Sequence, residues 1–407
     1  MIVSVNGSGL KGSIRVPESK SHAHRALICS ALSGNPSRII CEKTSADIDA
    51  TASCLNALGA VIERTYNGFS ISGLNKKDSC ILDCNESGST YRFMVPVACA
   101  LSEECTFLLR GRLPYRPMEP VFSNLKKHGI TITGEGSDAV TLKGRLTSGR
   151  YSIRGDISSQ YITGLLFALP LLDGDSLIEI KGELQSESYI NITLKTLSDY
   201  GIIIERKENT FCIAGGQKYI APEKLVVEAD WSNGAFWLSA GALSDNGITC
   251  LGLDSNSPQG DKRIIEILSS FGAEITEKDN AVTVKAGCLK GIELDAGDIP
   301  DLVPVISVVA AFAQGKTYIS NAGRLRLKES DRLETVSHLL NALGGRVTEY
   351  EDALLIEGVP LKGGRCSSFN DHRIAMSLAV ASVGCAERVV IEGAEAVNKS
   401  YPAFYDD

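Results

Sequence analysis

The sequence predicts an α/β repeat protein with two domains of three units each. Three observations lead to this prediction: the chain has 407 residues, 43% of them are apolar, and two patterns recur about every 70 residues. The length exceeds that of one ordinary domain, and the apolar fraction is sufficient for a packed core. A period of this size is typical of a chain assembled from copies of one unit.

The first pattern is Leu-x-x-x-Gly followed by a β-type run. It occurs five times, and its glycines are separated by 70, 72, 71 and 72 residues. A glycine after a leucine-bearing helical segment is a signal for a helix C-cap, and the apolar run that follows favours a strand. The glycines are Gly59, Gly129, Gly201, Gly272 and Gly344.

The second pattern is a short strand, a polar turn and a helix rich in small apolar residues. Six turns are separated by 68, 71, 74, 68 and 71 residues, with markers at Ser19, Ser87, Ser158, Ser232, Pro300 and Asp371. Each unit therefore reads as strand, helix, strand, helix, strand, strand. A lone unit cannot bury its apolar helix on all sides, and three units make a domain of ordinary size.

The phase of the repeat predicts a discontinuous domain. The sixth copy reaches Asp407 before its closing strands, and we expect the strand-like segments 2–5 and 12–16 to complete it. Residues 1–17 and 229–407 would then form one domain with both termini, and residues 18–228 the other.

Composition excludes several classes of protein. The net charge of −8 argues against a nucleic-acid-binding surface. The twelve cysteines show no metal-ligand spacing, and the N-terminus lacks the basic and apolar segments of a signal peptide. The longest apolar run, 302–313, is too short to span a membrane. We expect a cytoplasmic protein with reduced thiols, no bound metal, no nucleic acid and no membrane partner.

The polar turns are candidate anion sites, because a helix N-terminus offers unpaired N–H groups and the positive end of the helix dipole. Ordinary capping explains any single turn equally well, and for Asp230 and Ser232 we prefer it. Capping does not explain the cations that recur near these helix starts. They are Lys20, Arg25, Arg92, Arg116, Arg332, Arg373 and Lys399.

Motifs of other catalytic classes are missing from the sequence. It contains no GxxxxGK[ST], no GxGxxG after a strand, no GxSxG and no HExxH. His22 and His24 have no cysteine or carboxylate cluster to complete a zinc site.

A series of segments, in order from end to end of the chain, resembles the 5-enolpyruvylshikimate-3-phosphate synthase family. The strongest are Pro-Glu-Ser-Lys-Ser at 17–21 with Arg25-Ala-Leu, and Lys-Glu-Ser-Asp-Arg at 328–332. The others are Ser-Gly-Ser-Thr-Tyr-Arg at 87–92, Arg-Pro at 116–117, Ser-Ser-Gln at 158–160, Asn-Asp-His-Arg at 370–373 and the segment around Lys399.

The resemblance implies a fold and a reaction. Each domain would pack its helices inside a sheet-like wall, as an inside-out α/β barrel, with the active site in the cleft between the domains. The 5-hydroxyl of shikimate 3-phosphate would add to C2 of phosphoenolpyruvate, and the tetrahedral adduct would expel phosphate. The implied enzyme belongs to aromatic amino acid biosynthesis, is a monomer, and needs no metal or organic cofactor; its partners are small anionic substrates.

The resemblance also assigns roles to individual residues. The proton-transfer candidates are Lys20, Asp301 and Glu329. The shikimate 3-phosphate contacts are Lys20, Ser21, Arg25, Ser158, Ser159, Gln160, Ser186, Tyr189, Asp301 and Lys328. The phosphoenolpyruvate contacts are Lys20, Gly88, Arg116, Gln160, Arg332, Arg373 and Lys399. The substrates together carry roughly −6 when both phosphates are ionised, which suits this many cations.

Two positions depart from the family pattern, and two other functions stay open. Glu86 and Arg324 stand where many or some relatives have Asn. A UDP-N-acetylglucosamine enolpyruvyl transferase has Asn where Ser21 stands, and a reactive cysteine in the loop that is 112–117 here, which has none. A non-catalytic binding module of the same repeats would not need Asp301, Glu329 and Lys20 together.

Overall fold

The computed structural model describes residues 1–7 and 9–407. They form two compact units, Met1–Ser19 with Glu228–Asp407, and Lys20–Val227. We call them the terminal unit and the central unit. Each has a hydrophobic core of its own.

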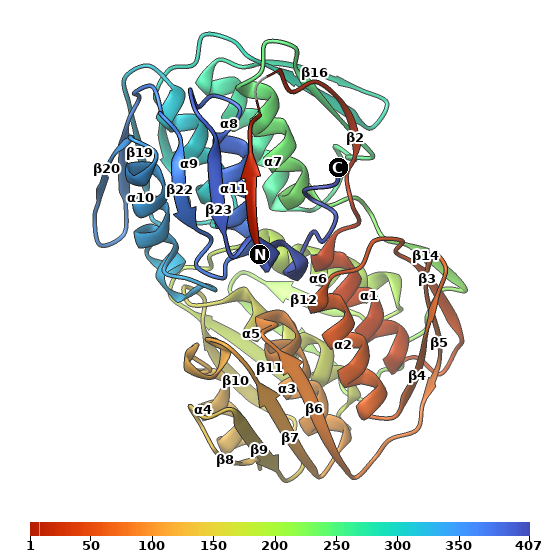
Figure 1. The fold of residues 1–407 in the computed structure, drawn as a ribbon. Coiled ribbons are helices and arrows are strands. Elements are labelled where there is room, and N and C mark those ends of the chain that lie inside the picture. The colour runs from red at the N-terminus through yellow and green to blue at the C-terminus, as the bar shows by residue number, and fades with distance from the viewer. Residues whose placement is uncertain (8) are drawn as a thin grey trace. The chain divides into compact units, whose positions relative to one another are not determined.

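The central unit alternates strands and helices along the whole segment (Figure 1). Its helices are α1 (Lys20–Leu32), α2 (Ala46–Ala57), α3 (Gly88–Leu101), α4 (Val121–Lys127), α5 (Ser159–Ala168) and α6 (Glu187–Asp199). Its strands are β3 (Ser37–Ile40), β4 (Ala60–Thr65), β5 (Gly68–Leu74), β6 (Ser79–Asn85), β7 (Glu104–Leu109), β8 (Thr131–Thr133), β9 (Ala139–Lys143), β10 (Arg150–Arg154), β11 (Ser176–Lys181), β12 (Ile204–Lys207), β13 (Thr210–Ile213) and β14 (Lys224–Val226).

The terminal unit follows the same alternation. Its helices are α7 (Trp231–Ala242), α8 (Ile264–Phe271), α9 (Val303–Phe312), α10 (Arg332–Ala342) and α11 (His372–Ala381), with short 3-10 turns η3 (Gly260–Arg263), η4 (Gly323–Leu327) and η5 (Ala394–Lys399). Its strands are β1 (Ile2–Val5), β2 (Gly12–Arg15), β15 (Ile248–Leu251), β16 (Glu274–Lys278), β17 (Ala281–Lys285), β18 (Glu293–Asp295), β19 (Lys316–Ser320), β20 (Arg346–Glu349), β21 (Leu354–Glu357), β22 (Gly364–Ser367) and β23 (Val389–Glu392).

One sheet pattern recurs in both units. In β6-β7-β9-β8, the first two strands are parallel, and β9 pairs antiparallel with both β7 and β8. The sheets β10-β11-β13-β12 and β18-β19-β21-β20 repeat this order. In β14-β3-β5-β4 the first strand comes last along the chain, so β14 closes the central unit by pairing parallel to β3. The result is a mixed α/β fold of repeated units.

The two N-terminal strands complete different copies. Strand β1 pairs antiparallel with β23, in the sixth copy as expected. The prediction for the second segment was wrong, because β2 pairs parallel with β15 in the fourth copy. The fourth copy begins directly with α7 and supplies no first strand of its own, so the edge of β15 is open to β2.

The five predicted C-cap glycines all adopt left-handed backbone, with φ between 77° and 105°. Space also requires glycine at some of them. A Cβ added at Gly59 would lie 1.8 Å from the carbonyl oxygen of Asn75. The glycine period therefore marks the positions where each second helix turns sharply into a strand.

The helices of each unit pack on one another. In the central unit α1 contacts α2 and α6, α3 contacts α2 and α5, and α5 contacts α6, which closes a ring. In the terminal unit α7, α9 and α11 contact one another, and α10 packs on α9 and α11. Within the described part of the chain, no helix is long and apolar enough to cross a membrane.

Candidate functional site

The marked turns lie at helix starts in five of the six copies. Ser87, Ser158 and Asp371 cap α3, α5 and α11, each accepting a backbone N–H of the first turn. The turn at Pro300 differs, because α9 begins only at Val303. Asp230 caps α7 as expected, but Ser232 does not, since its hydroxyl donates instead to Asp261.

Arg25 is a buried cation whose contacts are neutral. Its side chain donates to Thr193 Oγ1 at 2.8 Å, to the Ser21 carbonyl at 2.6 Å and to the Tyr189 carbonyl at 2.9 Å. The residue is 2% exposed, and burial lowers its pKa to about 10. A buried charge that only neutral oxygens compensate favours an anionic ligand nearby. These bonds also draw Ser21 and Tyr189, both predicted site residues, around one guanidinium.

The start of α3 gathers two further guanidinium groups. A Cβ added at Gly88 would lie 2.6 Å from Arg116 Nη1 and 2.9 Å from Arg92 Nη1. Arg92 Nη1 also donates to Gln160 Oε1 at 2.8 Å, and Gln160 Nε2 donates to Ser89 Oγ at 2.9 Å. Two arginine forks beside a helix N-terminus form an arrangement suited to carboxylate or phosphate.

Lys20 and the starts of three helices are tied together. Lys20 Nζ lies 3.0 Å from Asp47 Oδ2, on α2. Behind this pair, His24 Nδ1 contacts Thr51 Oγ1 at 2.7 Å, and Thr51 contacts Thr90 Oγ1 at 2.7 Å. Burial holds the pKa of His24 well below its ordinary value, so the ring is neutral. This chain fixes α1, α2 and α3 relative to one another, and with them the groups at their N-termini.

The remaining predicted serines of the central unit lie at the starts of α5 and α6. Ser158 caps α5, and Ser159, its first residue, is buried. Ser186 precedes α6 with a left-handed backbone, φ 55°, and is 3% exposed. Because α5 contacts both α3 and α6, the three serines lie at the starts of two helices that pack on each other.

In the terminal unit, Asp301 is the centre of a cluster of cations. Its Oδ1 accepts from Lys328 Nζ at 3.2 Å and from Arg332 Nη1 at 2.8 Å, and its Oδ2 accepts from Arg373 Nη2 at 3.1 Å. Sequence reasoning placed all four residues at the site, and the structure brings them together. We call these four residues the Asp301 cluster.

Arg332 is held on two further sides. Its Nη2 lies 2.7 Å from Glu329 Oε2, and its Nε lies 2.8 Å from Asp371 Oδ2. Burial raises the pKa of Asp371, but the Arg332 charge, its hydrogen bond and the nearby His372 together act more strongly, so the net shift is downward. This pairing fixes the fork of Arg332 and places Glu329 beside it.

Lys328 is a cation of the Asp301 cluster whose pKa lies near the physiological range. Burial lowers its pKa to about 8, while the Asp301 carboxylate acts in the opposite direction. Lys399 Nζ donates to the Asn370 carbonyl at 2.7 Å, next to the start of α11. The terminal unit therefore carries its own group of anion-binding side chains, as the central unit does.

Sequence reasoning missed some members of these groups. Asp47, the partner of Lys20, was not predicted, and Arg92 was noted as a cation but not given a role. The Arg332 partner Asp371 was noted only as a turn residue. The motifs that contain Arg92 and Asp371 were recognised, whereas Asp47 lies in α2 with no such signal.

The two departures from the family pattern have defined surroundings. A Cβ added at Gly111 would lie 2.7 Å from Glu86 Oε2, so the Glu86 side chain lies against that loop. Arg324 Nη2 donates to the Gly297 carbonyl at 2.9 Å. Among residues 1–7 and 9–407, no group of three or more His, Cys, Asp or Glu is arranged to hold a metal ion.

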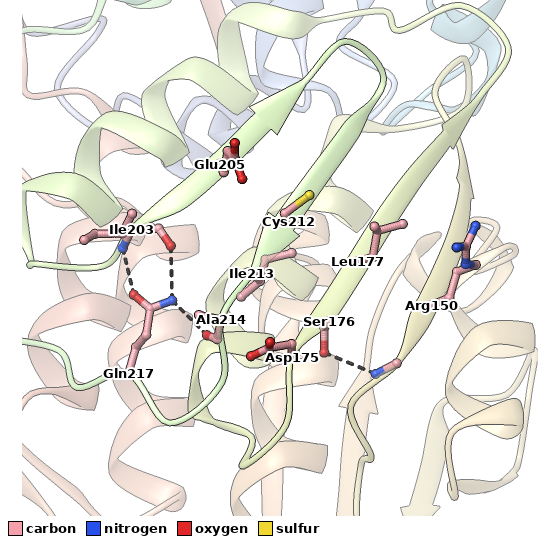
Figure 2. A pocket seen from close by; sticks show the side chains of 11 residues that line it. Arg150, Asp175, Ser176, Leu177, Ile203, Glu205, Cys212, Ile213, Ala214 and Gln217 are labelled. Carbon is pink, nitrogen blue, oxygen red and sulfur yellow. Dashed lines mark hydrogen bonds between the residues drawn. The ribbon is translucent and has the colours of Figure 1, made fainter.

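A pocket on the sheet β10-β11-β13-β12 contains none of the predicted site residues (Figure 2). It is lined by apolar and charged side chains from all four strands, among them Arg150, Leu177, Glu205 and Cys212. At its edge the Gln217 amide bonds both backbone groups of Ile203, through Oε1 at 2.8 Å and Nε2 at 3.1 Å.

Comparison with known proteins places the chain in one family. Residues 5–407 match the sequence model of EPSP synthase (3-phosphoshikimate 1-carboxyvinyltransferase). The chain is 47% identical to a 3-phosphoshikimate 1-carboxyvinyltransferase of Clostridium kluyveri and 45% identical to one of Clostridium acetobutylicum, in each case over 100% of this chain and 96% of the relative.

Solved structures agree with the sequence relatives. An EPSP synthase of Acinetobacter baumannii superposes with a TM-score of 0.83 at 26% identity, covering 100% of this chain and 97% of that one. The enolpyruvyl transferase NikO of Streptomyces tendae, at 19% identity and a TM-score of 0.81 over 100% and 96% of the two chains, shares the fold. From its matched sequence and its fold, this chain belongs to the EPSP synthase family.

Proposed function

We propose that this protein transfers the enolpyruvyl group of phosphoenolpyruvate to the 5-hydroxyl of shikimate 3-phosphate and releases phosphate. Membership of the EPSP synthase family supports the reaction. The structural observation that best supports this reaction is the Asp301 cluster, where three cations surround one carboxylate. Such a cluster supplies both anion binding and a proton acceptor.

Shikimate 3-phosphate would bind mainly through the central unit. The Arg25 charge, buried among neutral oxygens, supports a carboxylate or phosphate beside it. The helix starts at Ser158 and Ser186 offer hydroxyls and N–H groups to the same ligand. The proposed contacts are Lys20, Ser21, Arg25, Ser158, Ser159, Gln160, Ser186, Tyr189, Asp301 and Lys328.

Phosphoenolpyruvate would bind to arginine forks of both units. Gly88 and Arg116 offer the N-terminus of α3 and a guanidinium, and the Asp301 cluster offers Arg332 and Arg373. Forks of this kind form paired hydrogen bonds with carboxylate and phosphate oxygens. The proposed contacts are Lys20, Gly88, Arg116, Gln160, Arg332, Arg373 and Lys399.

The proton transfers would involve Asp301, Glu329 and Lys20. In the addition step the O5–C2 bond forms, the hydroxyl proton leaves to a base and C3 gains a proton. In the elimination step the bond from C2 to the phosphate oxygen breaks and C3 loses a proton. Asp301 is our choice for the base that accepts the hydroxyl proton. Glu329, in its protonated form, is our choice for the acid that gives C3 its proton and, as the resulting carboxylate, takes one back in the elimination step; both side chains are held beside Arg332.

Further features of the proposal follow from the family resemblance. We propose two domains, 1–17 with 229–407 and 18–228, each an inside-out α/β barrel with its helices inside a sheet wall. The closed ring of helices in the central unit supports this arrangement. The enzyme would work in the cytoplasm as a monomer, on small anionic substrates and without a metal or organic cofactor. The expectation that the active site lies between the domains stays a prediction.

Release of inorganic phosphate tests the proposal. The purified protein is mixed with phosphoenolpyruvate and either shikimate 3-phosphate or UDP-N-acetylglucosamine. We expect phosphate release when the second substrate is shikimate 3-phosphate and none when it is UDP-N-acetylglucosamine. Release only with the nucleotide sugar would instead identify the alternative enolpyruvyl transferase, and release with neither would remove the proposed activity.

A further inference from the structure

Asp261 is a buried carboxyl group that the proposed reaction does not use. It lies in η3 and is 2% exposed. One oxygen, Oδ2, accepts a hydrogen bond from the Ser232 hydroxyl on α7. The other, Oδ1, is fully buried and has no hydrogen-bond partner among the residues that the structure describes. Buried carboxylates normally receive several donors, so the surroundings of Asp261 stabilise its ionised form poorly.

The helix that carries Ser232, α7, packs against both α9 and α11, and Arg373 of the Asp301 cluster lies in the first turn of α11. Burial raises the pKa of Asp261 to about 6; the Asp301 charge acts in the same direction, and the Arg373 charge and the Ser232 hydrogen bond act against it. Asp230, the N-cap of α7, adds a further negative charge. The charged residues on η3 itself and on the packed helix α8 are Lys262, Arg263 and Glu266.

We propose that Asp261 takes up a proton when an anion binds to the Asp301 cluster, and that this proton sets the affinity of the cluster for anions. Without ligand, the positive charge of Arg373 helps Asp261 to stay ionised. A bound anion neutralises that charge and brings a further negative charge near the buried carboxyl group. A proton on Oδ1 then neutralises Asp261, and this removes the repulsion between Asp261 and the bound anion.

The proposal fixes the direction of the pH dependence. The pKa of Asp261 without ligand is about 6, so the group is largely ionised at pH 7.5 and must gain a proton on binding. The anion therefore binds more weakly as the pH rises above about 6, until the pH passes the pKa that Asp261 has in the anion-bound protein. Each unit by which the bound anion raises that pKa corresponds to about a tenfold change in affinity.

Sulfate is a suitable probe, because it carries no titratable proton between pH 5.5 and 7.5. Its dissociation constant is measured by calorimetry across this range in the full chain and in Asp261→Asn, in two buffers of different ionisation enthalpy. We expect the wild type to take up protons when sulfate binds, and to lose about tenfold in sulfate affinity between pH 5.5 and 7.5. The Asn variant should take up fewer protons, show a flatter profile and bind sulfate more tightly than the wild type at pH 7.5. Structural damage would not produce tighter binding.

Two more variants separate the proton from simple packing. Ser232→Ala removes the donor that favours the ionised form of Asp261. The pKa of Asp261 should therefore rise, and the loss of sulfate affinity should begin at a higher pH. Asp295→Asn changes an exposed carboxyl group of the same unit and should behave as the wild type. Equal proton uptake in the wild type and Asp261→Asn, or weaker sulfate binding by that variant, would overturn the proposal.

The inference rests on the proposed function only for the identity of the physiological anion. An enzyme that turns over both substrates but shows no difference between wild type and Asp261→Asn would contradict this inference alone. Sulfate binding with the expected pH profile but no turnover would contradict the proposed function alone. Failure of sulfate to bind the wild type across the pH range would overturn the anion-binding role of the cluster, on which the inference depends.

Discussion

Replacing Asp301 by Asn should separate anion binding from turnover. The amide keeps the size of the side chain and removes the negative charge that Lys328, Arg332 and Arg373 now share. A phosphate or carboxylate that binds these cations must compete with Asp301 for their N–H groups. The variant should therefore bind phosphoenolpyruvate more tightly while it loses the proposed proton acceptor.

The expected size follows from the contacts. A hydrogen bond to a charged group contributes about 1.5–3 kcal/mol, and the Asp301 side chain is 16% exposed, so solvent screens it only in part. Relief of competition at one arginine should tighten phosphoenolpyruvate binding by roughly 10- to 150-fold, at about 1.4 kcal/mol per factor of ten. Loss of a positioned proton acceptor should lower kcat by about 10²–10⁴-fold.

The assay measures both quantities on one preparation. Calorimetry gives the dissociation constant of phosphoenolpyruvate, and phosphate release gives kcat at saturating substrates. Asp295→Asn is the matched control, because it makes the same chemical change at an exposed position. If folded Asp301→Asn binds phosphoenolpyruvate more weakly than the wild type, Asp301 is not a competitor for these cations and the reasoning fails.

Three further predictions concern neighbouring groups. Glu329→Gln should lower kcat by about 10²–10⁴-fold with little change in substrate binding, and a kcat within about threefold of the wild type would exclude an essential proton carrier there. Arg116→Ala and Arg373→Ala should each raise the KM of phosphoenolpyruvate by the equivalent of about 1.5–3 kcal/mol, whereas Arg154→Ala, which breaks an exposed pair, should leave it unchanged. Phosphoenolpyruvate KM should rise with pH through about 8, as Lys328 loses the proton that gives it charge, and Lys328→Gln should remove this contribution while leaving the one that Asp261 makes at lower pH.

The repeat could be predicted because it depends on local backbone requirements. Each helix that turns sharply into a strand needs a residue with positive φ, and glycine meets that need at Gly59 and its four equivalents. The place of β2 could not be predicted in this way. Whether a strand joins the fourth copy or the sixth depends on which sheet edge is open, and that is a property of the assembled unit.

The candidate site was predictable where a motif is continuous along the chain. The segment from Lys328 to Arg332 and the turn before Arg373 carry their own signals. Pairings between distant segments carry none, as the partners of Lys20 and Ser232 illustrate. Asp47 is 27 residues from Lys20, and Asp261 is 29 residues from Ser232. A serine at a helix start was interpreted as a cap because nothing in the sequence marks the buried acid that it contacts.

The most direct test of the central claim follows the carbon skeleton. Phosphoenolpyruvate labelled with ¹³C at C2 is incubated with the protein and shikimate 3-phosphate, and the product is examined by NMR. The account predicts that the labelled carbon becomes part of an enol ether on the 5-oxygen, with one phosphate released for each ether formed. Labelled pyruvate without an ether, or a label attached to any other oxygen, would contradict the account.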